Sequence, residues 1–344
     1  MESNFEDKVV MVTGACGTVG AELVRQLSAL PVAQIICIDN NESELFFLAE
    51  QYRSTGKISV FLADIRDLDA LKLRMRGVDV VLHSAALKHV GLCENSPNQA
   101  IQTNILGTQN VISAAVANGV ERVVFTSSDK AVNPTNVMGT SKLMGERLMT
   151  AASQIYGASA GNRIRGNVST IFSSTRFGNV LGSRGSVLPL FRQQIDRGGP
   201  LTLTDRDMTR FIMSLEEAAK LVLDSVWLAV GGEVMVTKMP VAKIEDLAEL
   251  LISETAQNVP VDIEVIGAKP GEKLYEELMN DEEVRRTWDL GDFFVVLSAF
   301  ANPSDEAYAH LRGTGQPNRP YKSDEEPALT VDELAEYLRV RGLI

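Results

Sequence analysis

The stretch KVVMVTGACGTVG, residues 8–20, places a short apolar run before a glycine-rich turn and a helical pattern that continues through Leu30. In this order the residues predict a strand, a tight loop and a helix. Gly14 would permit the tight turn, Gly17 would let the backbone approach a pyrophosphate at the helix amino end, and Gly20 would let the helix pack closely on the sheet. The stretch therefore predicts a dinucleotide-binding turn.

Side chains that suit the rest of a dinucleotide follow the next strands. Asp39 lies about 20 residues beyond the turn, at the end of the second predicted strand, where a carboxylate can hydrogen-bond an adenosine ribose. Because an acid there repels a 2′-phosphate, Asp39 favours NAD, but a nearby basic residue could compensate, which leaves NADP open. The third strand ends in groups that could meet the adenine, and small residues follow the fourth. The predicted cofactor contacts are Gly14, Gly17, Thr18, Val19, Gly20, Asp39, Asp64, Ile65, Ala85 and Ala86.

Five apolar runs alternate with amphipathic segments in the first part of the chain. Strands that are buried on both faces and separated by helices predict a Rossmann-type, doubly wound parallel α/β sheet, with ligands at the carboxyl ends of the strands. A strand is predicted from Val168 to Arg176, and beyond Phe177 the pattern changes to shorter, mixed pieces. We predict a NAD-binding domain over residues 1–177, which can receive later segments, a smaller mixed α/β substrate-binding lobe over 178–300, and a C-terminal tail and helix over 301–344.

Composition and charge restrict the ligand class. The 344 residues are 45% hydrophobic and carry a formal net charge of −12. This charge argues against a nucleic-acid or anionic-membrane surface, because any anionic ligand must be met by local positive groups. The most apolar predicted helix, residues 215–230, contains too many charges for a membrane span, and the amino terminus shows no signal-peptide apolar region. We expect a cytoplasmic enzyme with a small-molecule ligand.

Cysteine and histidine spacing predicts no metal site. Cys16, Cys37 and Cys93 show no CxxC spacing, so neither a disulfide framework nor a zinc site is indicated. His83 and His89 flank the end of the fourth strand without a third ligand at metal spacing. We interpret them as satisfied core or loop histidines.

A second informative stretch is SSDKAVNPTNVMGTSK, residues 127–142. Asp129 and Lys130 place a carboxyl and an amine at the end of the fifth strand, where each can shift the pKa of the other. Met138 and Lys142 are four residues apart, which puts both on one face of a helix. Since Met138 cannot take a proton, the proton of a substrate hydroxyl would go to Ser128, to Asp129 or to a water.

These stretches resemble the extended short-chain dehydrogenase/reductases and, more narrowly, the UDP-N-acetylglucosamine 4,6-dehydratases of bacterial polysaccharide and nonulosonate biosynthesis. The resemblance covers about residues 8–280. It rests on the GxxGxxG spacing, AALKHV at 85–90, Asn104, the 127–142 stretch, RFGNVLGSRGSV at 176–187, MTRF at 208–211 and KPGEKL at 269–274. Long members of the family carry an amino-terminal membrane region, and this chain looks like a soluble member.

The resemblance implies an internal redox elimination. Hydride leaves C4 of the sugar for a tightly bound NAD, water is lost across C5 and C6, and hydride returns to C6, which regenerates the cofactor. By resemblance, Lys130 is the base for the C5 proton, Asp129 is the acid for the leaving hydroxyl, and Ser128 stands at a hydroxyl position of the family. Lys142 would bind the nicotinamide ribose. Methionine at position 138, in place of tyrosine, looks like the mark of the branch that retains configuration at C5.

The resemblance also implies substrate contacts and an assembly. The predicted contacts with UDP-N-acetylglucosamine or the cofactor are Lys88, Asn104, Asn179, Arg184, Arg210 and Glu272. Relatives pair through the helices near residues 101–118 and 136–156, which implies a homo-oligomer. The alternatives are a nucleotide-sugar 4-epimerase or reductase, a dehydratase that inverts C5, and a non-catalytic dinucleotide sensor. The presence of Asp129, Lys130 and Lys142 argues against a sensor that has lost its activity.

Overall fold

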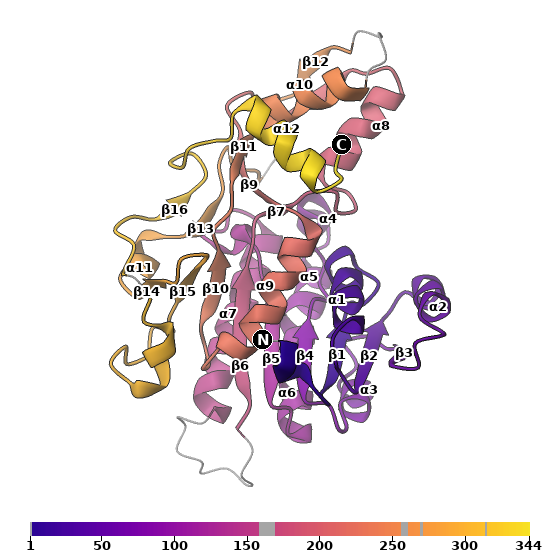
Figure 1. Ribbon diagram of the computed structural model, residues 1–344, viewed down its shortest axis with the longest axis vertical. Helices are drawn as coiled ribbons and strands as arrows, with labels where there is room; N and C mark the ends of the chain where they lie inside the picture. Colours follow the sequence, from indigo (N-terminus) through magenta and orange to yellow (C-terminus); the bar gives the residue numbers. More distant parts are fainter. Residues whose placement is uncertain (1, 158–168, 256–260, 269–270, 314) are drawn as a thin grey trace.

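A nine-stranded sheet forms the centre of the computed structural model, which describes residues 2–157, 169–255, 261–268, 271–313 and 315–344 (Figure 1). From one edge to the other the strands are β14 (Thr287–Asp289), β15 (Phe293–Val296), β10 (Val234–Thr237), β6 (Ile171–Arg176), β5 (Arg122–Thr126), β4 (Val80–His83), β1 (Val9–Thr13), β2 (Gln34–Asp39) and β3 (Ile58–Leu62). The strands from β3 to β10 pair in parallel, and β15 and β14 add an antiparallel edge. The predicted parallel α/β sheet is confirmed.

Helices cover both faces of this sheet because its strands are apolar on both sides. Val10 and Val12 of β1 enter one hydrophobic cluster, and Met11 between them enters another on the opposite face. On one face α1 packs against α9, and on the other α6 packs between α3 and α7 (Figure 1). These helices are α1 (Thr18–Ser28), α2 (Glu42–Gln51), α3 (Leu68–Arg74), α6 (Thr108–Asn118), α7 (Val137–Tyr156) and α9 (Leu215–Leu228). Short turns, α4 (Val90–Asn95), α5 (Pro97–Ala100) and the π-helix η2 (Ile101–Gly107), lead into α6.

A second, smaller lobe lies beyond the carboxyl ends of the strands, at the upper end of Figure 1. A separate hydrophobic cluster joins its helices and small sheets. Its helices are α8 (Val187–Asp196), α10 (Ile244–Thr255) and α12 (Val331–Val340), and its strands are β7 (Asn179–Val180), β8 (Leu201–Leu203), β9 (Thr209–Met213), β11 (Val241–Lys243) and β12 (Ile263–Val265). The strands β10, β14 and β15 follow residue 177 in the chain but join the central sheet. The domain boundary at residue 177 therefore stays a prediction.

The segment 301–327, for which the sequence predicts only a tail, packs against the two lobes. Within it, β16 (Tyr321–Lys322) pairs with β13 (Glu277–Met279), and the Tyr321 hydroxyl bonds both backbone groups of Met239. The remaining short helices are η1 (Glu2–Phe5), η3 (Asp129–Ala131), α11 (Asp281–Val284) and η5 (Glu306–Leu311). Among the helices described, none is both long and apolar enough to span a membrane.

A buried arginine ties the central sheet to α7 on one side and to β13 and α11 on the other. Arg176, at the end of β6, is 1% exposed and donates paired hydrogen bonds to Glu146 of α7, at 2.7 and 2.8 Å, and to Glu283 of α11, both at 2.8 Å. A fifth donor contacts the Leu278 carbonyl oxygen at 3.0 Å. Burial would raise the pKa of Glu283, but Arg176 holds it below its usual range. Both carboxylates therefore depend on one guanidinium.

We expect Arg176→Met to lower the free energy of unfolding by about 3–5 kcal/mol, because it leaves two buried carboxylates without their cation. Urea denaturation followed by circular dichroism measures the change. Since the pKa of Glu283 is lowered on folding, its stabilising contribution is complete above the ordinary carboxyl pKa and is lost as the pH falls through the lowered value.

The control is the triple variant Arg176→Met, Glu146→Gln, Glu283→Gln. It removes all three charges together, so much of the lost stability should return. A single Arg176→Met variant as stable as the wild type would show that this ion network does not hold β6, α7 and α11 together.

Candidate active site

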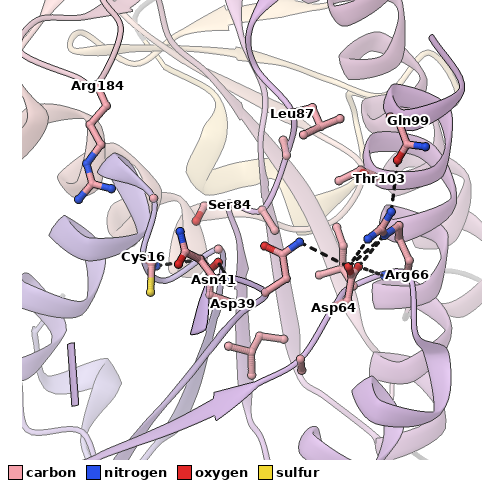
Figure 2. A pocket seen from close by; sticks show the side chains of 18 residues that line it. Cys16, Asp39, Asn41, Asp64, Arg66, Ser84, Leu87, Gln99, Thr103 and Arg184 are labelled. Carbon is pink, nitrogen blue, oxygen red and sulfur yellow. Dashed lines mark hydrogen bonds and ion pairs between the residues drawn. The ribbon is translucent and has the colours of Figure 1, made fainter. Parts of the chain in front are cut away.

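A first cavity, of about 450 Å³, lies at the carboxyl ends of β1, β2, β3 and β4 (Figure 2). Parallel strands end at one edge of a sheet, so residues that are distant in sequence meet there. The cavity wall contains seven of the predicted cofactor contacts: Gly14, Gly17, Asp39, Asp64, Ile65, Ala85 and Ala86. The cavity also takes in Arg66, Gln99 and Thr103, which the sequence did not single out.

The turn after β1 has no room for side chains. Gly14 has φ +68°, and a Cβ atom on it would lie 2.7 Å from the Ala85 backbone. A Cβ atom on Gly20 would lie 2.0 Å from the Gly14 carbonyl oxygen. The glycines thus let β1, α1 and the strand beside them approach closely, with the amino end of α1 beside the cavity. This cradle fits the pyrophosphate of a dinucleotide.

Thr18 and Val19, at the start of α1, contact other parts of the chain. The Thr18 hydroxyl oxygen accepts a hydrogen bond from the Arg184 backbone N–H at 3.3 Å. Val19 is partly buried against the larger hydrophobic cluster. Their contacts with a cofactor stay predictions.

Two carboxylates of the first cavity are fixed differently. Asp39 accepts hydrogen bonds from the backbone N–H groups of Cys16 and Asn41, both at 3.0 Å. Asp64 forms a forked ion pair with Arg66, with distances of 2.6 to 3.0 Å, and these hydrogen bonds lower the pKa of Asp64 (Figure 2). Asp39 is therefore held in place by the backbone, whereas Asp64 already has a cation as its partner.

Lys142 and Met138 point to different surroundings although they share one face of α7. The Lys142 ammonium is buried, donates a hydrogen bond to the Thr126 carbonyl oxygen at 2.9 Å, and lies 4.7 Å from the centre of the Phe125 ring. Burial lowers the pKa of Lys142 to about 8. Met138 is 3% exposed and packs in a small apolar cluster with Cys93. Its side chain therefore fills the core between α4 and α7.

The histidines and cysteines offer no metal site in the described part of the chain. No group of three His, Cys, Asp or Glu side chains there could hold an ion. His83 bonds the hydroxyl groups of Thr13, at 2.7 Å, and Thr108, at 3.1 Å, and burial lowers its pKa to about 3. It is thus a neutral core histidine. The three cysteines are buried and free.

A second cavity, of about 660 Å³, opens between the sheet edge and the smaller lobe. Its wall carries polar side chains from both lobes on a largely apolar surface. Among them are four that the sequence singled out and two that it did not: Lys130, Asn179, Arg210, Glu272, Lys273 and Glu276. Arg210 is 6% exposed and donates to the carbonyl oxygens of Thr209, Lys273 and Leu274. This cavity suits a larger polar ligand than a simple sugar.

The Asp129–Lys130 pair sits on the short helix η3, directly after β5. Asp129 is fully buried, and its Oδ1 accepts hydrogen bonds from the Ser128 hydroxyl at 2.7 Å, the Lys130 N–H at 2.8 Å and the Lys130 ammonium at 3.1 Å. Gly139 permits this position, because a Cβ atom there would lie 2.2 Å from the Lys130 carbonyl oxygen. The close packing of α7 on η3 thus fixes Lys130 at the cavity wall, with Asp129 buried beside it.

A second carboxylate lies on the other side of Lys130. Glu276 is 3% exposed, and its Oε1 lies 3.2 Å from the Lys130 ammonium. Burial would lower the pKa of Lys130, but Asp129 and Glu276 together raise it. Three buried oxygens around this pair, Ser127 Oγ, Asp129 Oδ2 and Glu276 Oε2, have no hydrogen-bond partner within the described residues. A cluster with spare acceptors and a buried amine can exchange protons with a ligand.

Three predicted substrate contacts are occupied elsewhere. Asn104 is 1% exposed and bonds both backbone groups of Leu87 and the Ser141 hydroxyl. The Lys88 ammonium donates to the Arg184 carbonyl oxygen at 2.8 Å. The Arg184 side chain pairs with Glu44 at 3.0 Å and borders the first cavity. Their contacts with a substrate stay predictions, as does the site as a whole.

Comparison with known proteins shows the family to which this chain belongs. A family model described as "Polysaccharide biosynthesis protein" matches residues 10–298. The chain is 50% identical to a Methanocaldococcus jannaschii protein named an uncharacterized membrane protein, over 86% of this chain and 87% of that one. It is 40% identical to a Rickettsia rickettsii protein named UDP-glucose 4-epimerase, over 85% and 83%. It is 35% identical to a Campylobacter jejuni protein named UDP-N-acetylglucosamine 4,6-dehydratase (inverting), over 94% of both.

Solved structures agree with the fold. The X-ray structure of Pen from Bacillus thuringiensis superposes with a TM-score of 0.87 at 39% identity and covers 98% of each chain. The chain spans about half the length of two further relatives that are named as polysaccharide biosynthesis proteins. The chain therefore belongs to the polysaccharide biosynthesis protein family, within the extended short-chain dehydrogenase/reductases.

Proposed function

We propose that this protein is an NAD-dependent 4,6-dehydratase that converts UDP-N-acetylglucosamine to a UDP-4-keto-6-deoxy-N-acetylhexosamine for surface polysaccharide or glycan biosynthesis. The observation that carries the proposal is Lys130 at the wall of the second cavity, with the fully buried Asp129 carboxylate 3.1 Å behind its ammonium. Simple oxidation of an alcohol needs one base. A carboxyl group and an amine side by side supply the acid and the base that elimination of water requires.

The first cavity would hold the dinucleotide. Gly14 and Gly17 would face its pyrophosphate, Asp39 would accept from the adenosine ribose, and Lys142 would donate to the nicotinamide ribose. When bound, the nicotinamide supplies a hydride acceptor for C4 and a donor for C6. The fixed carboxylate of Asp39 supports NAD, and Arg66 is the basic group that leaves NADP open.

Ser128 and Asp129 would take the proton of the C4 hydroxyl. The Ser128 hydroxyl donates to Asp129 Oδ1 and accepts from the Lys130 N–H at 3.3 Å, so one lone pair remains for a donor on the substrate. When the C4 hydroxyl of the sugar gives its proton to the Ser128 oxygen, the Ser128 hydroxyl can pass its own proton to the Asp129 carboxylate. Met138 has no part in this relay, since its thioether is buried in the apolar cluster.

Lys130 and Asp129 would then carry out the elimination. A 4-ketone makes the C5 proton acidic, and the Lys130 amine removes it. Asp129, which was protonated when the C4 hydroxyl lost its proton, now protonates the C6 hydroxyl, which leaves as water. After hydride addition at C6, the Lys130 ammonium returns its proton to C5. The protons therefore balance over one cycle, and the two residues end as they began.

The second cavity would hold the nucleotide sugar. In a chain of net charge −12, the diphosphate needs local cations, and Arg210 and Lys273 are on the cavity wall. Asn179 and Glu272 border the same cavity and offer an amide and a carboxylate to the phosphate and the uridine ribose. Arg184, at the first cavity, is better placed for the cofactor than for the sugar nucleotide.

We infer retention of configuration at C5. In this site the Lys130 amine both removes and returns the C5 proton, so the proton comes back to the face that it left. A tyrosine at position 138 would offer a second proton donor, and Met138 cannot. The Campylobacter jejuni relative, 35% identical, is named as inverting, so the stereochemistry needs a direct measurement.

A 4-epimerase is the second candidate, because the 40% identical Rickettsia rickettsii relative carries that name. An epimerase returns hydride to C4 and leaves C5 and C6 untouched. It has no use for a second acid–base pair, so the buried Asp129 and Lys130 favour dehydration.

Assembly into a homo-oligomer remains part of the proposal. Exposed apolar side chains lie on η2 and α7, the region through which the resemblance implies pairing: Ile101, Leu106, Met144 and Ile155. A second copy of the chain could cover them.

Incubation of the purified protein with NAD and UDP-N-acetylglucosamine in deuterated water should yield a 4-keto-6-deoxy product with deuterium at C5. NMR spectroscopy of the product gives both the label and the configuration at C5, which we expect to be unchanged. An epimerised sugar without deuterium at C5 would identify the 4-epimerase, and cofactor binding without turnover would favour the sensor.

Asp129→Asn and Lys130→Ala should each reduce kcat by about 10²-fold or more, because each removes a proton-transfer group. Both should still bind NAD, measured by calorimetry, since neither residue lines the first cavity. The matched control is Lys238→Ala, whose ammonium pairs with Asp289 at 2.7 Å, away from the second cavity. Full activity in either site variant would overturn the assigned roles.

A further inference from the structure

Glu276 is a buried carboxylate to which the proposed reaction assigns no step. Its Oε1 lies 3.2 Å from the Lys130 ammonium and 3.7 Å from Arg210 Nε. Its Oε2 is buried without a hydrogen-bond partner among the described residues, and the side chain borders the second cavity. A buried carboxylate with an unsatisfied oxygen is costly, so its position beside Lys130 calls for a reason.

Two hydrogen bonds with Ser323 hold the backbone of Glu276 in place. Its N–H donates to the Ser323 hydroxyl oxygen at 3.0 Å, and its carbonyl oxygen accepts from the Ser323 N–H at 2.9 Å. Ser323 in turn bonds the Thr209 hydroxyl at 2.9 Å. The segment after β16 and the start of β9 thus fix the backbone of Glu276, which keeps its carboxylate beside Lys130 and away from solvent.

The two carboxylates beside Lys130 differ in the hydrogen bonds that they accept from the protein. Asp129 Oδ1 accepts three hydrogen bonds, two of them from Ser128 and the Lys130 backbone. Glu276 has the Lys130 ammonium and a more distant guanidinium, because the other donors of Arg210 are directed at backbone carbonyl oxygens. Hydrogen bonds to a carboxylate favour its charged form. Glu276 therefore has few donors to hold its charged form.

We propose that Glu276 is a positioning residue that takes the resting proton of Lys130 and so frees the amine to act on the sugar. In this step one N–H bond of the ammonium breaks and one O–H bond forms at Glu276 Oε1. The electron pair left on the Lys130 nitrogen first points at the new O–H group, and rotation about the Cε–Nζ bond turns it toward the second cavity, which Lys130 borders. The inference rests on the proposed function, because a base at C5 must be an uncharged amine.

The charges around Lys130 agree with this transfer. Asp129, Glu276 and Arg210 are the charged groups that act on it, and their sum keeps the amine protonated while both carboxylates are ionised. Lys273 donates instead to the Val132 carbonyl oxygen at 3.0 Å. Burial and the Asp129 charge raise the pKa of Glu276, against the opposing effect of Lys130. Transfer of one proton replaces a buried ion pair by two neutral groups.

The test is Glu276→Gln, whose amide keeps the shape but accepts no proton. We expect kcat to fall at least about tenfold at neutral pH with little change in KM. The lost activity should return as the pH rises through the pKa of Lys130, because solvent then takes the proton. The wild type should show no such rise over the same range. A merely structural role would not produce this pH profile.

A second measurement does not depend on turnover. Trace labelling of amines with acetic anhydride at a series of pH values, read by mass spectrometry of the Lys130 peptide, gives the pH at which this amine loses its proton. Removal of the Glu276 charge should lower that midpoint by about one pH unit or more. Wild-type kcat in Glu276→Gln at neutral pH, or an unchanged labelling midpoint, would overturn the proposal.

Matched variants separate the explanations. Glu277→Gln removes the next carboxylate along the chain, which accepts from Asn133 and lies 4.0 Å from Lys273, and should leave the Lys130 midpoint unchanged. Glu276→Asp, which also serves if the Gln variant does not fold, should restore a flat pH profile at a reduced kcat. If the wild type made no keto sugar, the proposed function would fail, but a shifted labelling midpoint would still support the Lys130–Glu276 proton pair.

Discussion

The double fork between Arg176 and two buried carboxylates is the interaction on which the packing of α7 and α11 against the central sheet depends. Glu146 belongs to the helix that carries Lys142, and Glu283 follows the strand that begins beside Glu276. Removal of these charges from water is costly, and only a complete set of partners offsets it. The pairing therefore permits one relative placement of β6, α7 and α11. Asn136, the N-cap of α7, and Glu276, which directly precedes β13, border the second cavity, so the fork helps to set the geometry of that cavity from inside the core.

The cofactor side of the site could be predicted from the sequence, because its determinants are local. An apolar strand, a glycine turn and a helix follow one another within residues 8–30, and period and turn chemistry identify each of them. Asp39, Asp64 and Ala85 could be grouped without a structure, since they follow parallel strands whose ends meet at one edge. The same logic placed Asp129 and Lys130 at the edge of the sheet.

The substrate side could not be predicted in the same way, because its contacts are long-range and irregular. Glu272, Glu276 and Glu277 stand close together in one charged segment, and the sequence does not distinguish which of them turns inward. Glu276 and Glu277 are both buried, and only the contact with Ser323, from the far end of the chain, sets Glu276 beside Lys130. The position of Arg184 could not be predicted either, because long-range contacts set it. The turns that carry it cross to the first cavity, where Thr18 and Glu44 hold it.

The centre of the site gives up stability in return for chemistry. Ser127 Oγ, Asp129 Oδ2 and Glu276 Oε2 are buried without partners among the described residues, and an unsatisfied buried polar group costs about 1–3 kcal/mol. A fold selected only for stability would replace them with apolar side chains. Two carboxylates face two cations here, so the cluster is near neutral and can move a proton internally without a net change of charge. Binding of a ligand with several hydroxyl groups would satisfy the spare oxygens, so part of this cost would be recovered when the ligand binds.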